Sequence, residues 1–69
     1  MNQELQDFAR KTLKEGLEKC TDDQRLIFKR MYSHKDLEKP IDAVVDQMPA
    51  EKLSWAMDQV KRTVVKNAG

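Results

Sequence analysis

The sequence has few of the residues that build covalent, metal or phosphate-binding scaffolds. Its 69 residues include one cysteine, one histidine, two glycines and two prolines. A single cysteine excludes an internal disulfide, and a single histidine excludes a site of two or more histidines within the chain. Neither glycine belongs to a phosphate-binding loop, and no apolar run approaches the ~20 residues that cross a bilayer. Helix packing, alone or with a partner, is what remains to stabilise so short a chain.

An excess of charge of one sign is also missing. Thirteen Lys and Arg residues nearly balance twelve Asp and Glu residues, which argues against a surface built entirely for nucleic acid. Residues 1–10 carry no apolar stretch of the kind found in signal peptides. We therefore expect a single cytoplasmic domain that spans residues 1–69 and has no membrane segment.

With so few glycines and prolines, long helices joined by short turns are expected. The first helix is predicted from Gln3 to Lys19, where apolar residues recur at helical spacing. Gly16 lies on the same apolar arc and costs about 1 kcal/mol relative to alanine, so we expect another helix to approach it closely. The arc consists of Leu5, Phe8, Ala9, Leu13, Leu17 and Cys20.

The start of the second helix carries the strongest local signal in the chain. Thr21 and Gln24 have the spacing of a capping box, and two aspartates follow Thr21 in the first turn. The helix is predicted to run to Tyr32 or Ser33. The tight turn before Thr21 predicts that the first two helices form an antiparallel hairpin. The apolar side of the second helix consists of Leu26, Ile27, Phe28, Met31 and Tyr32.

Two prolines frame a short third helix. Asp36 is the best available cap, so the helix is predicted to begin at Leu37 and to hold Pro40 in its first turn. Pro49 disfavours helical geometry at Met48 and ends the helix there. Its apolar set is Leu37, Ile41, Val44, Val45 and Met48.

The fourth helix is predicted from Pro49 or Ala50 to about Lys66. Three basic residues near its end suit the negative pole of the helix dipole. Its apolar stripe consists of Leu53, Ala56, Met57, Val60 and Val64. The sequence therefore predicts an all-α bundle of four helices, the third one short.

Catalytic and metal-binding sets are not supported. Cys20 is a candidate nucleophile with His34 as its base, but Cys20 lies on an apolar arc where a buried cysteine is an ordinary core residue. His34, Asp36 and Glu38 are close enough in sequence to reach one cation, yet the chain lacks the four Cys and His ligands of structural zinc. We expect no enzyme activity, no cofactor and no metal.

One basic stretch suggests nucleic acid as a partner. Residues 24–35 hold no acidic residue, and the second and third helices read as a helix-turn-helix. However, the recognition helix would carry Asp42 and Asp46 and no basic residue, so phosphates would repel it. The alternative is that the basic residues form a solvated helix face. The basic residues are Arg25, Lys29, Arg30 and Lys35.

Trp55 does not lie on the apolar side of the predicted fourth helix. It lies about 160° from the apolar stripe at 100° per residue, on an arc of polar side chains, and Val65 is also off the stripe. A second surface is needed to cover Trp55, supplied either by the third helix folding across or by another molecule. If the partner is another molecule, the predicted binding residues are Trp55, Gln59, Arg62 and Lys66.

Two segments carry a resemblance to other proteins. Residues 28–34 (FKRMYSH) and 48–60 (MPAEKLSWAMDQV) resemble short uncharacterised helical proteins encoded in bacteriophage and prophage genomes. The resemblance covers roughly the second half of the chain and brings no catalytic or binding residue with it. It implies a small protein of the bacterial cytosol that acts by binding a host or phage protein.

Three functions follow from these observations. The leading hypothesis is a non-enzymatic helical module that binds a protein partner, with Trp55 at the contact. The rival is a small nucleic-acid-binding protein that uses the basic stretch, and the third is a structural homo-oligomer. Because a core of this size is thin, we also expect a homodimer at micromolar concentrations, formed through the fourth helix.

Overall fold

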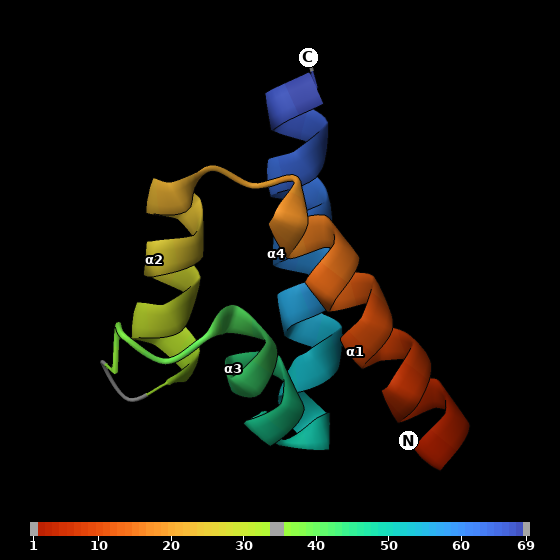
Figure 1. Ribbon diagram of the computed structural model, residues 1–69. Coiled ribbons are helices and arrows are strands. Elements are labelled where there is room, and N and C mark those ends of the chain that lie inside the picture. Colours follow the sequence, from red (N-terminus) through yellow and green to blue (C-terminus); the bar gives the residue numbers. More distant parts are fainter. Residues whose placement is uncertain (1, 34–35, 69) are drawn as a thin grey trace.

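The computed structural model describes residues 2–33 and 36–68 and consists of four helices joined by short connections (Figure 1). The prediction of an all-α fold with a short third helix is confirmed, and the described residues contain no strand. The helices are α1 (Gln3–Glu18), α2 (Asp22–Tyr32), α3 (Ile41–Gln47) and α4 (Ala50–Ala68).

Side-chain caps begin the first two helices. The Asn2 side chain accepts a hydrogen bond from the Leu5 N–H at 2.8 Å and caps α1. At α2 both halves of the predicted capping box are present. The Gln24 N–H donates to Thr21 Oγ1 at 3.2 Å, and the Thr21 N–H donates to Gln24 Oε1 at 2.8 Å. The predicted start of the second helix is therefore confirmed.

Removing the α2 cap should weaken the fold measurably. We expect Thr21→Ala to lower the free energy of unfolding by ~1 kcal/mol, because the Gln24 N–H loses its acceptor. Urea denaturation followed by circular dichroism measures the change. Thr21→Ser keeps the hydroxyl and should retain most of the stability, whereas equal losses in both variants would contradict the capping role.

The predicted start of the third helix is wrong by four residues. α3 begins at Ile41 rather than Leu37, and Pro40 precedes the helix with an extended ψ of 143° instead of lying in its first turn. The physical reason is the restriction that a proline places on the residue before it. Lys39 is pushed away from helical geometry, so no helix runs through it from Leu37. Asp36 therefore caps nothing, and its N–H donates to the Ser33 carbonyl at 3.0 Å.

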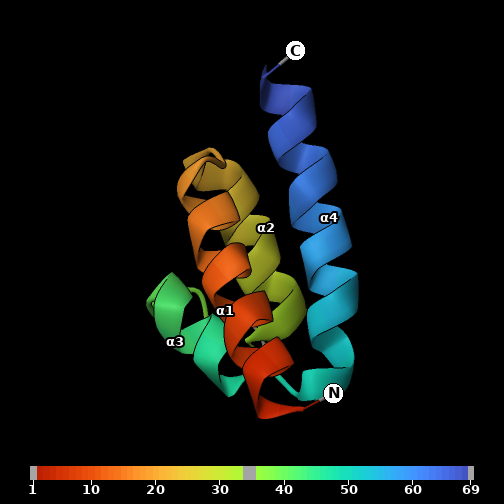
Figure 2. The same ribbon diagram turned by 90° about the vertical axis from the view of Figure 1, so that its right-hand side faces the viewer.

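The helix pairs that pack closely are α1 with α4, α1 with α3, and α2 with α3. The expected hairpin of α1 and α2 is not among these pairs. The two helices run in roughly opposite directions but diverge from their short connection, and α2 stands apart from α1 in Figure 1. In Figures 1 and 2 the C-terminal end of α4 extends beyond the turn between α1 and α2.

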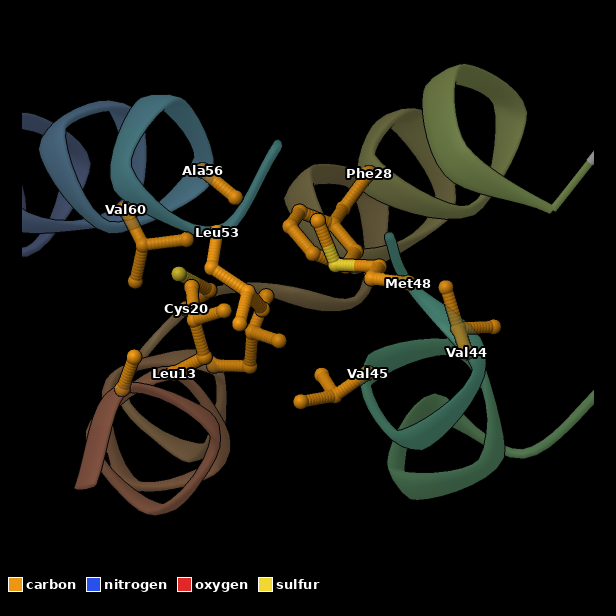
Figure 3. Close-up of a cluster of buried hydrophobic side chains, with 11 residues drawn as sticks. Leu13, Cys20, Phe28, Val44, Val45, Met48, Leu53, Ala56 and Val60 are labelled. Atoms are coloured by element: carbon orange, nitrogen blue, oxygen red, sulfur yellow. The ribbon is translucent and has the colours of Figure 1, made fainter. Parts of the chain in front are cut away.

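The core lies between two pairs of helices. In Figure 3, α1 and α3 lie on one side of the buried cluster, and α2 and α4 lie on the other. The helix α2 contributes a single buried side chain, that of Phe28, which lies close to Met48 (Figure 3). The cluster consists of Ala9, Leu13, Leu17, Cys20, Phe28, Val44, Val45, Met48, Leu53, Ala56 and Val60.

Several apolar residues expected in the core lie on the surface instead. The molecule measures 32 × 28 × 15 Å, and helix axes pack 8–10 Å apart, so its short dimension holds at most two layers of helices. Each helix is therefore covered on one side only, and apolar residues at the edge of an arc stay in solvent. The exposed residues from the predicted stripes are Leu5, Phe8, Leu26, Ile27 and Met31.

Gly16 lies where α4 crosses α1, as predicted. A Cβ atom added to Gly16 would lie 2.5 Å from Val60 Cγ1, closer than any ordinary contact. The missing side chain is thus what allows the two helices to approach. The cost in helix propensity is offset by the contact between α1 and α4, the longest helices of the fold.

Gly16→Ala should destabilise the protein even though alanine is the better helix former. Overpacking costs typically 1–3 kcal/mol and the gain in propensity is about 1 kcal/mol, so we expect a net loss of ~1 kcal/mol. In a Val60→Ala background the clash disappears, and the same change should become stabilising. A double-mutant cycle by urea denaturation measures both values. A gain in both backgrounds would contradict the close approach.

Two long side chains of α1 hold α3 in place. The Arg10 guanidinium donates to the backbone carbonyls of Val45 at 2.5 Å and Met48 at 3.1 Å. Lys14 Nζ lies 2.8 Å from a carboxylate oxygen of Asp46. Arg10 thus gives the Met48 carbonyl a donor beyond the end of α3 and adds a second donor to the Val45 carbonyl, which also accepts from the Met48 N–H at 3.2 Å.

Candidate functional site

Trp55 lies on the outer face of α4, away from the core. Its side chain is 73% exposed, the highest value among the large hydrophobic residues that are described. The helix α3 does not cover it, so one of the two explanations offered for its position, burial within the chain, is wrong. The core is assembled from other residues of α4, namely Leu53, Ala56 and Val60.

The other three predicted partner-binding residues share this outer face. Gln59, Arg62 and Lys66 follow Trp55 at steps of four, three and four residues, which places all of them along one side of the helix. Each is exposed. Arg62 forms an ion pair with Asp58 at 3.1 Å, and both side chains remain largely in solvent. Exposed pairs of this kind contribute little to stability, so Arg62 can exchange Asp58 for another acceptor.

Gln59 has a second role that the sequence did not indicate. Its side-chain Oε1 accepts a hydrogen bond from Tyr32 Oη at 2.8 Å, which links α2 to α4. A reciprocal pair of amide hydrogen bonds between Gln24 and Asn67 links the same helices nearer their other ends, at 3.1 and 2.8 Å. The outer face of α4 therefore borders α2, and the hydrogen bond from Tyr32 holds the Gln59 side chain in place.

The basic stretch is partly engaged within the chain. Arg25 donates to the carbonyls of Leu17 at 3.0 Å and Cys20 at 2.6 Å, and also pairs with Asp22. Lys29 Nζ lies 3.4 Å from the carbonyl of Leu37. Of the proposed nucleic-acid-binding residues within the described part of the chain, Arg30 alone makes no intramolecular hydrogen bond or ion pair. Lys35 lies outside the described residues.

Arg25 acts as a cap for the end of α1. Its guanidinium reaches the Leu17 carbonyl in the last turn of α1 and the Cys20 carbonyl just after the helix, where positive charge is favourable. Half-buried and bound in this way, the guanidinium is occupied by the fold. The structure therefore does not present the predicted basic residues as one free surface.

Cys20 is a core residue. Its side chain is buried, and its Sγ donates to the Gly16 carbonyl at 3.4 Å. Burial raises the pKa of the Cys20 thiol, and the nearby positive charge of Arg25 opposes this shift only in part. A thiol kept protonated is a poor nucleophile. His34, the expected base, lies outside the described residues.

Among residues 2–33 and 36–68, no three His, Cys, Asp or Glu side chains come together as metal ligands. His34 of the proposed metal set is not described, while Asp36 and Glu38 are exposed. Within the same ranges, no helix is long and apolar enough to pass through a bilayer.

Two hollows on the surface were not foreseen from the sequence. A groove of about 520 Å³ runs between α1 and α4, with Gly16 and Val60 in its lining. A smaller cleft of about 200 Å³ lies between α2 and α4, and Cys20 and Phe28 contribute to it. The Val60 side chain occupies the space next to Gly16, so the larger groove lies beside this contact and has no signal of its own in the sequence.

The chain matches no protein-family model, no curated protein and no solved structure. The resemblance of its second half to phage-encoded proteins therefore stays a prediction.

Proposed function

We propose that this chain is a non-enzymatic helical module that binds a partner protein through the outer face of α4. The observation that carries the proposal is the exposure of Trp55. Tryptophan is among the residues enriched in binding hot spots, and here its large apolar surface takes no part in the core.

The surroundings of Trp55 support a protein partner. Gln59 and Arg62 carry hydrogen-bond donors on the same side of the helix as Trp55, and Lys66 extends this strip. An apolar centre with a polar, partly charged rim is the usual composition of a protein–protein contact. Tyr32 fixes the Gln59 side chain from α2, which reduces the ordering cost of binding. The proposed setting is the bacterial cytoplasm, with a host or phage protein as the partner.

The test compares Trp55→Ala with Ile27→Ala, which removes an exposed apolar side chain from α2, outside both the outer face of α4 and the groove between α1 and α4. Both side chains are exposed, so neither variant should lose more than ~0.5 kcal/mol of stability. Immobilised wild-type protein and the two variants are incubated with nuclease-treated bacterial lysate, and retained proteins are identified by mass spectrometry. We expect one protein that the wild type and Ile27→Ala retain and Trp55→Ala loses.

The nucleic-acid alternative predicts a different pattern. Retention that disappears after nuclease treatment, or that falls steeply with salt concentration, would indicate phosphate contacts. Retention that Trp55→Ala leaves unchanged would remove the outer face of α4 as the binding surface.

A further inference from the structure

One face of α1 carries large apolar side chains that no part of the described chain covers. Phe8 is 63% exposed, and Leu5 is also mostly in solvent. Thr12 and Gly16 continue the same face toward the C-terminal end of α1, since the four residues follow one another at steps of three or four. This face adjoins the groove between α1 and α4. Trp55 does not line that groove and lies on the outer face of α4 instead.

The groove begins where this apolar face ends. Thr12 and Gly16 line it from α1, and Met57 and Val64 line it from α4. The Val60 side chain occupies the space directly above Gly16, and the groove lies beside this contact, where Glu15 and Lys19 also line it. The groove volume of about 520 Å³ exceeds that of one aromatic side chain, so an apolar group from outside can enter beside Gly16.

Charged side chains on this face alternate in sign along α1. Glu4, Lys11, Glu15 and Lys19 are all exposed, and within the described residues none of the four side chains forms a hydrogen bond or ion pair. The charges run negative, positive, negative, positive from the N-terminal end, and in the opposite order of sign from the C-terminal end. An antiparallel second copy of the same face therefore sets acidic residues against basic ones, whereas a parallel copy sets like charges together.

The register of such a pair follows from the positions. A copy centred on Thr12 places Phe8 opposite Gly16, because each lies four residues from Thr12. In the same register Glu4 lies beside Lys19 of the other copy. Lys11 lies two positions from the other copy's Glu15 and equally far from its Lys11, so the centre of the contact gains little from charge. The outer pairs of Glu4 with Lys19 are therefore the charge contacts that favour the antiparallel arrangement.

We infer that a second copy of this chain docks on the face formed by α1 and the groove between α1 and α4. The two α1 helices run antiparallel about a two-fold axis near Thr12, and Phe8 of each copy enters the groove of the other beside Gly16. Such an isologous contact is the commonest form of self-association. The outer face of α4 stays free, so this inference does not depend on the proposed function.

The first test measures mass against concentration by sedimentation equilibrium. A two-fold contact loses two Phe8 side chains at once, so Phe8→Ala should raise the dimer dissociation constant about 100-fold. Ile27→Ala removes a side chain of comparable exposure from α2 and should leave the dissociation constant unchanged. A wild-type protein that stays monomeric at millimolar concentration would overturn the inference, and so would a dimer that Phe8→Ala leaves intact.

The second test exchanges charges across the contact. Glu4→Lys and Lys19→Glu should each weaken the dimer about tenfold, because each change sets like charges together. The variant that carries both changes restores opposite charges and should recover most of the affinity. Both positions are exposed, so loss of the fold does not explain weaker binding, and circular dichroism checks this. Singles without effect, or a double variant without recovery, would overturn the antiparallel register. Loss of the dimer in Trp55→Ala alone would place the contact on α4 instead.

Discussion

Replacing Leu53 by alanine is expected to remove most of the stability of the fold. Leu53 is 0% exposed and lies at the centre of the buried cluster in Figure 3. Truncating a buried leucine costs 2–5 kcal/mol, because the lost transfer free energy is accompanied by a cavity. A core of this size rarely supplies more than ~3–5 kcal/mol in total. We therefore expect Leu53→Ala to be largely unfolded at 25 °C by far-UV circular dichroism.

Trp55→Ala is the natural control for this prediction. It removes more apolar surface than Leu53→Ala does, but from a side chain that is mostly in solvent already. We expect its urea midpoint to stay within experimental error of the wild type. Comparable losses in the two variants would mean that Trp55 belongs to the core, and the proposed binding face would fall with it.

Local signals in the sequence predicted local structure well. The capping box at Thr21 needs only residues three apart, and both of its hydrogen bonds are present. The restriction that Pro49 places on Met48 acts between neighbours, and Met48 ends α3 with an extended ψ of 138°. The same rule applied to Lys39 and Pro40 would have placed the start of α3 correctly. At this helix the sequence offers a candidate cap at Asp36, but the steric effect of Pro40 on Lys39 is stronger.

Helical periodicity identified the apolar arcs but not which part of each arc is covered. Phe8 and Leu13 lie on the same predicted stripe, yet Phe8 is exposed and Leu13 is buried. The difference depends on where α4 crosses α1, and the periodicity of a single helix gives no information about that crossing. Gly16 was the exception, because a glycine on an apolar arc reports on the neighbouring helix. The sequence could not decide whether Trp55 is exposed or buried, for the same reason as for Phe8.

Contacts of a side chain with a distant part of the chain could not be predicted from the sequence. The sequence predicts Arg25 either in phosphate binding or on a solvated helix face, whereas it caps the end of α1. Gln59 was considered for partner binding, and it also receives the Tyr32 hydroxyl. Spacing rules describe neighbours on one helix. They say nothing about a guanidinium or an amide that reaches another element across the fold.

Arg10 provides the most consequential contact of this kind. Its guanidinium donates to carbonyls of two buried residues, Val45 and Met48. Hydrogen bonds to a charged group contribute about 1.5–3 kcal/mol each, and a buried acceptor left without a donor adds to the loss. We expect Arg10→Met, which keeps an apolar chain in place of the stem, to lower the free energy of unfolding by ~3 kcal/mol in urea denaturation.

Two further variants show whether the carbonyl contacts cause this loss. Arg10→Lys keeps the charge, but a single ammonium group lacks the planar fork that reaches both carbonyls, so we expect a loss between those of the wild type and Arg10→Met. Lys11→Met removes a neighbouring charge that is exposed and should change stability by less than ~0.5 kcal/mol. If Arg10→Met and Lys11→Met proved equally mild, α3 would be held by its apolar contacts alone. Hydrogen exchange localises the effect, because loss of the Arg10 bonds should increase exchange in α3 before the rest of the protein.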